Sequence, residues 1–174
     1  NTPPEQKSFL FLDERYAILA NPGVTLPGDL TIPATEHKKQ EISNNFVDML
    51  KISKKLSDYS IYFNGAKAGA SCPHLHFQAG KEKQLRGEKQ IFNALARPAE
   101  SNLNISVFSN SKLELYHPEN FLRECFILKS QNIKSIKDFF YFFMDKLKSI
   151  NQQFGTEPHV PSFGKYISSL EDYE

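Results

Sequence analysis

Short runs of apolar residues, several of them alternating with polar ones, mark strands in the first half of the chain. Residues 8–20 predict two short strands joined by an acidic turn, and a third strand covers about 29–33 after a segment rich in proline and glycine. Two further strands are expected at 59–64 and about 74–79, on either side of a loop of small residues. We expect these strands to pair in one sheet.

Two segments repeat apolar residues at helical spacing and predict amphipathic helices. The first runs from about 36 to 57, with Thr35 as its N-cap, and the second from about 133 to 151. Residues 80–102 hold several basic side chains with little periodicity, so we expect a solvated connection there.

The region between that connection and the second helix predicts more strands. Residues 103–109 and 112–117 form a hairpin about Asn110 and Ser111, and residues 122–129 form a further strand. Because most strands follow one another directly and helices are interspersed, the expected fold is α+β, with an antiparallel sheet and two main helices.

The length and composition of the chain suit one globular domain. It has 174 residues, of which 40% are hydrophobic, enough for a core of its own. We assign this domain to residues 1–158 and leave residues 159–174 as a tail of unknown role. The longest fully apolar run, Phe139 to Met144, is far too short to span a bilayer, so no membrane association is expected.

Charge and cysteine content narrow the class of function. The net charge is +1 and no long block of one sign occurs, which argues against nucleic-acid binding through bulk charge. The two cysteines, Cys72 and Cys125, do not make a disulfide framework, and the N-terminal residues include no apolar leader segment. We therefore expect reduced thiols and a cytoplasmic location.

Candidate chemistry is concentrated between Tyr62 and Gln78. In a strand, His74, His76 and Gln78 point to one face, while the intervening apolar residues point to the other, where a helix can cover them. The small residues of the preceding loop, 65–71, let backbone N–H groups approach an anion closely. This pattern indicates a phosphate beside a nucleophilic imidazole, since a neutral histidine can attack phosphorus when one ring nitrogen donates to a carbonyl and the other is unprotonated.

Two other interpretations of this motif stay open. The pattern His-x-His on one strand also suits zinc or iron, and His37, His117 or His159 could supply the third protein ligand. Alternatively, the two histidines are polar residues that only line a groove.

The string Gly69-Ala-Ser-Cys-Pro-His-Leu-His-Phe-Gln78 resembles the active-site signature of the histidine-triad superfamily, in the branch where glutamine replaces the third histidine. That branch contains galactose-1-phosphate uridylyltransferase, dinucleoside tetraphosphate phosphorylase and GDP-hexose phosphorylases. Upstream, Asn21-Pro-Gly, Pro27-Gly-Asp-Leu-Thr-Ile-Pro33 and His37 are similar to the corresponding stretch of the family.

This resemblance implies a fold like that of the histidine-triad proteins and a nucleotidyl transferase or phosphorylase. Such an enzyme acts on a nucleotide sugar or a dinucleoside polyphosphate, with phosphate as acceptor, through a covalent nucleotidyl-histidine. It requires no cofactor, although a divalent metal is compatible with it. A nucleotide hydrolase of the same type and a non-catalytic nucleotide-binding module are the alternatives. Because the phosphorylase relatives are much longer, the chain is expected to be a compact member, a fragment or one half of a homodimer.

The resemblance also implies a role for each site residue. His76 is the expected nucleophile, His74 orients and supports it, and Gln78 binds the nucleotidyl phosphate. The remaining implied residues are Asn21 at the ribose, Asn64, Gly69 and Ser71 at the phosphates, and His37 in support of the site. Apart from the resemblance, Lys67 in the small-residue loop either pairs with phosphate or is a solvated side chain.

Overall fold

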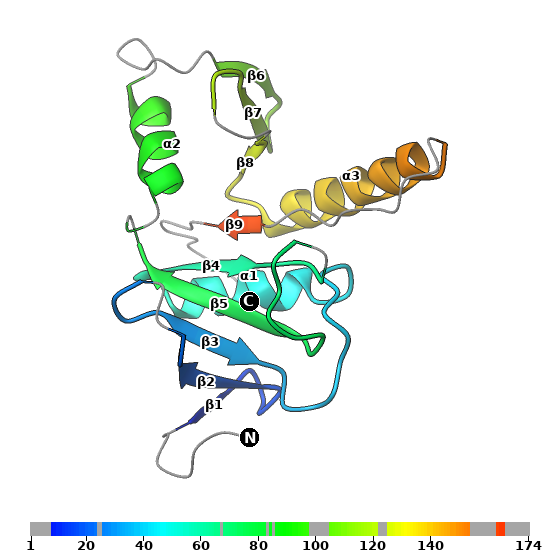
Figure 1. Ribbon diagram of the computed structural model, residues 1–174. Helices are drawn as coiled ribbons and strands as arrows, with labels where there is room; N and C mark the ends of the chain where they lie inside the picture. Colours follow the sequence, from blue (N-terminus) through cyan, green and yellow to red (C-terminus); the bar gives the residue numbers. More distant parts are fainter. Residues whose placement is uncertain are drawn as a thin grey trace.

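A computed structural model of the chain describes residues 8–23, 26–66, 68–82, 84, 86–97, 105–121, 125–153 and 163–165. The largest element among them is a six-stranded antiparallel sheet (Figure 1). Its strands lie in the order β1 (Phe9–Phe11), β2 (Tyr16–Ala20), β3 (Leu30–Pro33), β5 (His76–Lys81), β4 (Tyr59–Phe63) and β9 (Phe163–Lys165). The strands expected from the first half of the sequence are thereby confirmed.

One face of this sheet is apolar and packs against helix α1 (Phe46–Lys55), which lies behind β4 and β5 in Figure 1. Ile32, Ile61 and Phe77, one from each central strand, are fully buried in a cluster that includes Met49 of the helix. Because side chains alternate along a strand, the residues between them are directed to the opposite face of the sheet.

Helix α1 starts later than its apolar spacing predicted. It begins at Phe46, so the expectation of a helix that starts next to Thr35 is wrong. Instead, the Thr35 amide donates to the carbonyl of Arg15 (2.9 Å), and the Leu75 amide donates to the carbonyl of Lys38 (2.8 Å). Backbone pairing with two distant segments therefore keeps this stretch out of the helix, and such tertiary pairing outweighs a local helical preference.

A third helix, α2 (Arg86–Ala96), occupies residues for which the sequence predicted a solvated connection. The Ser60 hydroxyl on β4 donates to the Glu88 carboxylate and ties this helix to the main sheet. Ala94 is buried, so α2 has an apolar face that its polar and basic residues obscured in the sequence. The expectation of an irregular connection is wrong here, and the α+β class stands with three helices among the described residues.

A second antiparallel sheet and a long helix follow. Strands β6 (Ile105–Ser109), β7 (Glu114–Pro118) and β8 (Ile127–Lys129) pair in that order and lead into α3 (Ile133–Gln153). The predicted hairpin and the predicted second helix are confirmed. The described part of the third strand is shorter than expected, and residues 122–124 lie outside the described residues.

Helix α3 joins the second sheet to the main core. The ring of Phe140 stacks on that of Phe46 in α1, with centroids 3.8 Å apart, and Ile136 and Met144 are buried in the same cluster. Of residues 159–174, the structure describes Phe163–Lys165, which form β9 beside β4. Within the described part of the chain, no helix combines the length and the apolar character needed to cross a membrane.

Candidate active site

The predicted motif lies where the chain enters β5, and its residues divide between two faces as expected. Leu75, Phe77 and Ala79 are 0% exposed and belong to the core beneath the sheet. His76 and Gln78 therefore point to the face opposite α1. The expectation that the apolar set of this motif packs on the helix side is confirmed.

The ring of His76 is held in one tautomer by the backbone. Its Nδ1 lies 2.8 Å from the carbonyl oxygen of His74. A carbonyl oxygen can only accept a hydrogen bond, so Nδ1 carries the proton and the neutral ring has its lone pair on Nε2. The side chain is largely buried, and the Cys72 thiol sulfur lies 3.7 Å from the same Nδ1.

His74 is oriented by different partners from those of His76. Its Nε2 lies 2.7 Å from the carbonyl oxygen of Ala34 and therefore donates to it. Its Nδ1 faces Nδ1 of His37 at 3.3 Å, and the two rings stack with centroids 5.4 Å apart. A neutral His74 then accepts from His37, so the structure brings His37 into direct contact with the motif.

Gln78 and Asn64 meet through their side-chain amides. The Asn64 Nδ2 group, just after the end of β4, donates to Oε1 of Gln78 in β5 at 2.9 Å. Since that bond uses the carbonyl oxygen of Gln78, its amide nitrogen keeps two N–H donors that can be directed at an anion. The two side-chain amides thus form one hydrogen-bonded pair near His76, since Gln78 lies two residues after His76 in β5.

Gln40 belongs to this cluster although the sequence did not single it out. It is 5% exposed, its Oε1 accepts the backbone N–H of His76 at 2.8 Å, and its Nε2 donates to the carbonyl of Asn64 at 2.8 Å. Nothing in local spacing marks a glutamine that precedes a helix, because its partners lie more than twenty residues away in the chain.

The small-residue loop has a different backbone arrangement from the one expected. The amides of Ala68 and Ala70 both donate to the carbonyl of Gly65, at 2.9 and 3.3 Å, so these two N–H groups turn inward. Gly69 has φ of +94°, a left-handed conformation that favours glycine, and it is exposed together with Ser71. The expectation that the loop amides approach an anion is therefore wrong for these two alanines.

Lys67 lies outside the described residues. Its expected contact with phosphate stays a prediction.

Asn21 lies at the other end of the strands from His76. Its Nδ2 donates to the buried Asp29 carboxylate at 3.0 Å, and its Oδ1 accepts the Gly23 amide at 3.2 Å. Strand register pairs Leu30 with Ala79 but pairs His76 with the residue three positions after Leu30, which separates Asn21 from His76 by roughly 10 Å or more along the sheet. The structure does not bring Asn21 to the imidazole, and its predicted ribose contact stays a prediction.

The candidate third metal ligands are dispersed. His37 contacts His74 as described, His117 stacks on Phe126 in the second sheet with centroids 5.0 Å apart, and His159 lies outside the described residues. Among the residues that the structure describes, no three or more His, Cys, Asp or Glu side chains are grouped as metal ligands would be.

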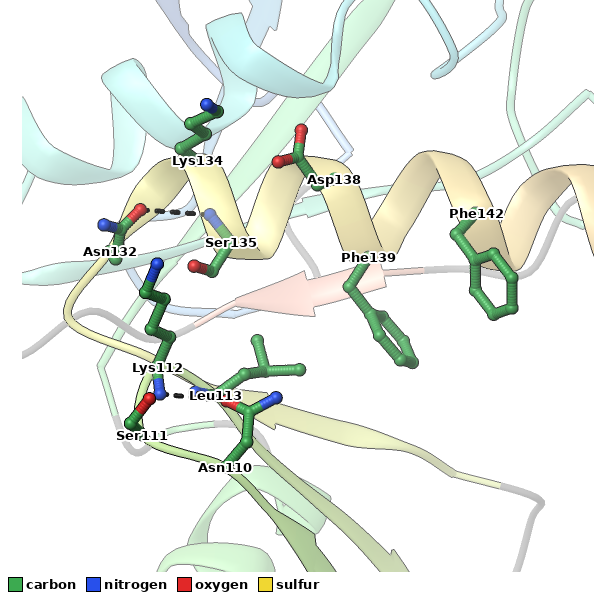
Figure 2. A pocket seen from close by; sticks show the side chains of 10 residues that line it. All are labelled: Asn110, Ser111, Lys112, Leu113, Asn132, Lys134, Ser135, Asp138, Phe139 and Phe142. Carbon is green, nitrogen blue, oxygen red and sulfur yellow. Dashed lines mark hydrogen bonds between the residues drawn. The ribbon is translucent and has the colours of Figure 1, made fainter.

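A groove of about 660 Å³ lies elsewhere on the molecule, between the β6–β7 turn and the start of α3. Figure 2 shows Lys112, Lys134, Phe139 and Phe142 among its lining side chains, and Asn132 caps the helix by accepting the Ser135 amide. No described residue of the predicted site lines this groove, so it is separate from the motif around His76.

The chain is thus an α+β protein with a cluster of imidazole and amide side chains at the start of a central strand, β5. Residues 1–81 match a family described as Domain of unknown function (DUF4922). That stretch contains β1 to β5, α1 and every site residue predicted from the motif. No curated protein and no solved structure matches the chain significantly.

Proposed function

We propose that this chain is a nucleotidyl transferase or phosphorylase of the histidine-triad type, with His76 as the nucleophile. The observation that carries the proposal is the 2.8 Å contact between Nδ1 of His76 and the carbonyl oxygen of His74. This contact leaves the Nε2 lone pair free of a proton, which is the form of imidazole that attacks phosphorus.

The reaction has two displacements. In the first, the Nε2 lone pair of His76 attacks the α-phosphorus of a nucleotide sugar or dinucleoside polyphosphate, and the bond to the leaving phosphate oxygen breaks. In the second, an oxygen of the acceptor phosphate attacks the same phosphorus, and the electron pair of the N–P bond returns to Nε2. While the adduct exists, the imidazole ring carries a positive charge, which the hydrogen bond from Nδ1 to the His74 carbonyl stabilises.

The amide pair of Asn64 and Gln78 suits the charge that develops on the phosphoryl oxygens. Because Gln78 accepts from Asn64 through Oε1, its N–H groups are left to donate to those oxygens. A glutamine cannot transfer a proton to or from water at neutral pH, so an acceptor phosphate competes better for the adduct than in a site with a third imidazole.

Adduct formation tests this proposal directly. We would incubate the protein with α-labelled ATP, UDP-hexoses, GDP-hexoses and dinucleoside tetraphosphates, and measure label that stays on the protein in alkali and leaves it in acid. The expected result is labelling of the wild type by at least one donor and no labelling of the His76→Ala variant. His117→Ala, which removes a histidine in the second sheet, serves as the matched control and should label normally.

Adding phosphate to the labelled protein separates the remaining alternatives. Release of a nucleoside diphosphate or a related phosphorylated product that depends on phosphate supports a phosphorylase, and release in buffer alone indicates a hydrolase. Reversible nucleotide binding without any adduct indicates a non-catalytic module. Equal labelling of wild type and His76→Ala would contradict the proposed nucleophile.

A further inference from the structure

The described register of β4 with β5 ends before it reaches His76, and the side chain of Gln40 bonds to both backbones beyond that point. Their last described pair toward the site is Tyr62 with Gln78, and two further steps of the same register would set Asn64 opposite His76. The two backbones are bridged there by the side chain of Gln40 instead.

The Gln40 amide pairs with three backbone groups of Asn64 and His76. Its Oε1 accepts the His76 N–H at 2.8 Å, and its Nε2 donates to the carbonyl of Asn64 at 2.8 Å and to that of His76 at 3.2 Å. Both Gln40 and His76 are buried, where an unpaired backbone group is costly. A primary amide has one acceptor oxygen and two N–H donors, so one side chain satisfies all three backbone groups.

The backbone of Gln40 is itself fixed against the segment that precedes β5. Its amide donates to the carbonyl of Pro73 at 2.9 Å, and the Leu75 amide donates to Lys38 at 2.8 Å. The segment that leads into Gln40 is therefore anchored by two backbone hydrogen bonds to the residues just before β5. The bridge cannot shift along β5 without breaking these bonds.

We propose that Gln40 is the positioning residue of this site, which sets the separation between the His76 imidazole and the Asn64–Gln78 amide pair. The assignment of a catalytic role to His76 rests on the proposed function, whereas the bridge between Asn64 and His76 rests on the contacts of Gln40 alone. Gln40 does not touch the reacting atoms; it acts through the backbone of the residues that do.

Two substitutions test the hydrogen bonds that Gln40 accepts and donates. Gln40→Met keeps much of the volume and removes both the acceptor and the donors. Gln40→Glu keeps an acceptor for the His76 N–H but turns an oxygen toward the carbonyls of Asn64 and His76, which repels them. Ser60→Ala is the matched control, because Ser60 is a buried polar residue at the far end of β4 that bonds to Glu88 in α2.

The first measurements are the rate of adduct formation and the affinity for the nucleotide donor. A displacement of reacting groups by a fraction of an ångström slows reaction far more than it weakens binding, so we expect Gln40→Met to form the adduct about 10-fold more slowly or worse. Its donor affinity should change by less than about 3-fold, and Ser60→Ala should match the wild type in both. A Gln40→Met protein that is folded and labels at the wild-type rate overturns the proposal.

The second measurements do not require turnover. In the wild type, hydrogen exchange should be slow at the His76 backbone amide, and nitrogen NMR of the imidazole should report the tautomer protonated at Nδ1. Gln40→Met should accelerate that exchange and mix the tautomers, whereas Ser60→Ala should do neither. If no donor labels the wild type, the proposed function fails while these measurements still decide the role of Gln40. If Gln40→Met does not fold, fast exchange of the His76 amide in the wild type overturns the bridge and slow exchange supports it.

Discussion

Two histidines that are two residues apart have separate structural roles. The ring of His76 donates to a backbone carbonyl, and the residue that supplies this carbonyl is His74. The ring of His74 points to Ala34 and His37 instead. Support of the proposed nucleophile by His74 therefore runs through the His74 backbone, and the His74 side chain joins the site to the segment before α1.

The separate roles of the His74 backbone and side chain lead to an expectation for His74→Ala. The substitution keeps the carbonyl that holds His76 and loses the contacts with Ala34 and His37, so adduct formation should slow by about 10-fold instead of being lost. The rate of label incorporation, measured beside His76→Ala, checks it. A His74→Ala protein as inactive as His76→Ala would contradict the division, provided that its circular dichroism matches the wild type.

The two free thiols should differ in reactivity. Burial raises the pKa of the Cys125 thiol, which lowers its thiolate fraction at neutral pH, whereas Cys72 is exposed. Iodoacetamide should therefore modify Cys72 first, as peptide mass spectrometry can measure. Because the Cys72 sulfur lies 3.7 Å from Nδ1 of His76, the modified protein should also form less adduct. A Cys125→Ser variant is the control, and faster labelling of Cys125 than of Cys72 would contradict the expectation.

At the scale of elements, strands were easier to predict than helices. The strands around His76 were predictable because alternation depends only on residues two apart. The predicted start of helix α1 lies too close to Thr35. In the structure Thr35 pairs with Arg15 and Lys38 pairs with Leu75, and a local spacing pattern contains no information on such distant partners. Helix α2 was missed because its first half is charged and polar, its apolar residues lie only in its second half, and Ala94 is buried through tertiary contact.

Helix α1 is also attached to β2 by a polar contact. The Asp48 carboxylate accepts the Tyr16 hydroxyl at 2.9 Å and pairs with Arg15. Burial and this hydrogen bond raise the pKa of Tyr16, so the neutral hydroxyl is the form that the fold requires.

Asp48→Ala should destabilise the fold by about 1–3 kcal/mol, because it leaves the fully buried Tyr16 hydroxyl without this acceptor. Urea unfolding measures the loss. Adding Tyr16→Phe to Asp48→Ala should recover part of the free energy of unfolding, since it removes the hydroxyl that has lost its acceptor. Strict additivity of the two substitutions would contradict a direct coupling.

The second sheet has a pH-sensitive contact. The Tyr116 hydroxyl donates to Glu114, which with burial raises the pKa of Tyr116 from 10.0 to about 12. A folded-state pKa above the unfolded value means that the contribution to stability is complete below pH 10 and disappears as the pH rises toward about 12. Across that interval the free energy of unfolding should fall more steeply for the wild type than for Tyr116→Phe. Parallel pH dependences in chemical denaturation would contradict this.

At the scale of the whole molecule, one core connects the site to the second sheet. Phe140 of α3 is 4% exposed and stacks on Phe46 of α1, the helix that supports the apolar face of β5. The site around His76 and the region that carries the groove of Figure 2 are therefore expected to unfold together.

Phe140→Ala should lower the free energy of unfolding by about 3–5 kcal/mol, because it opens a cavity between α1 and α3. Calorimetry should show a single transition at a lower temperature. Phe142→Ala is the matched control on the same helix, since Phe142 is 58% exposed, and it should change stability little. Two separate transitions in the Phe140→Ala protein would mean that the two regions do not share a cooperative core.

The sequence by itself determined which face of β5 carries His76 and Gln78 and which face enters the core, because strand alternation is a local property of the backbone. It also determined the α+β class, through the order of strand and helix patterns. Only the tertiary structure decided the partner of each ring and the place of Gln40, because Gln40 is joined to Asn64 and His76 by hydrogen bonds between segments far apart in the chain. Such bonds depend on strand register and on where two strands part, and neither is a property of any short segment.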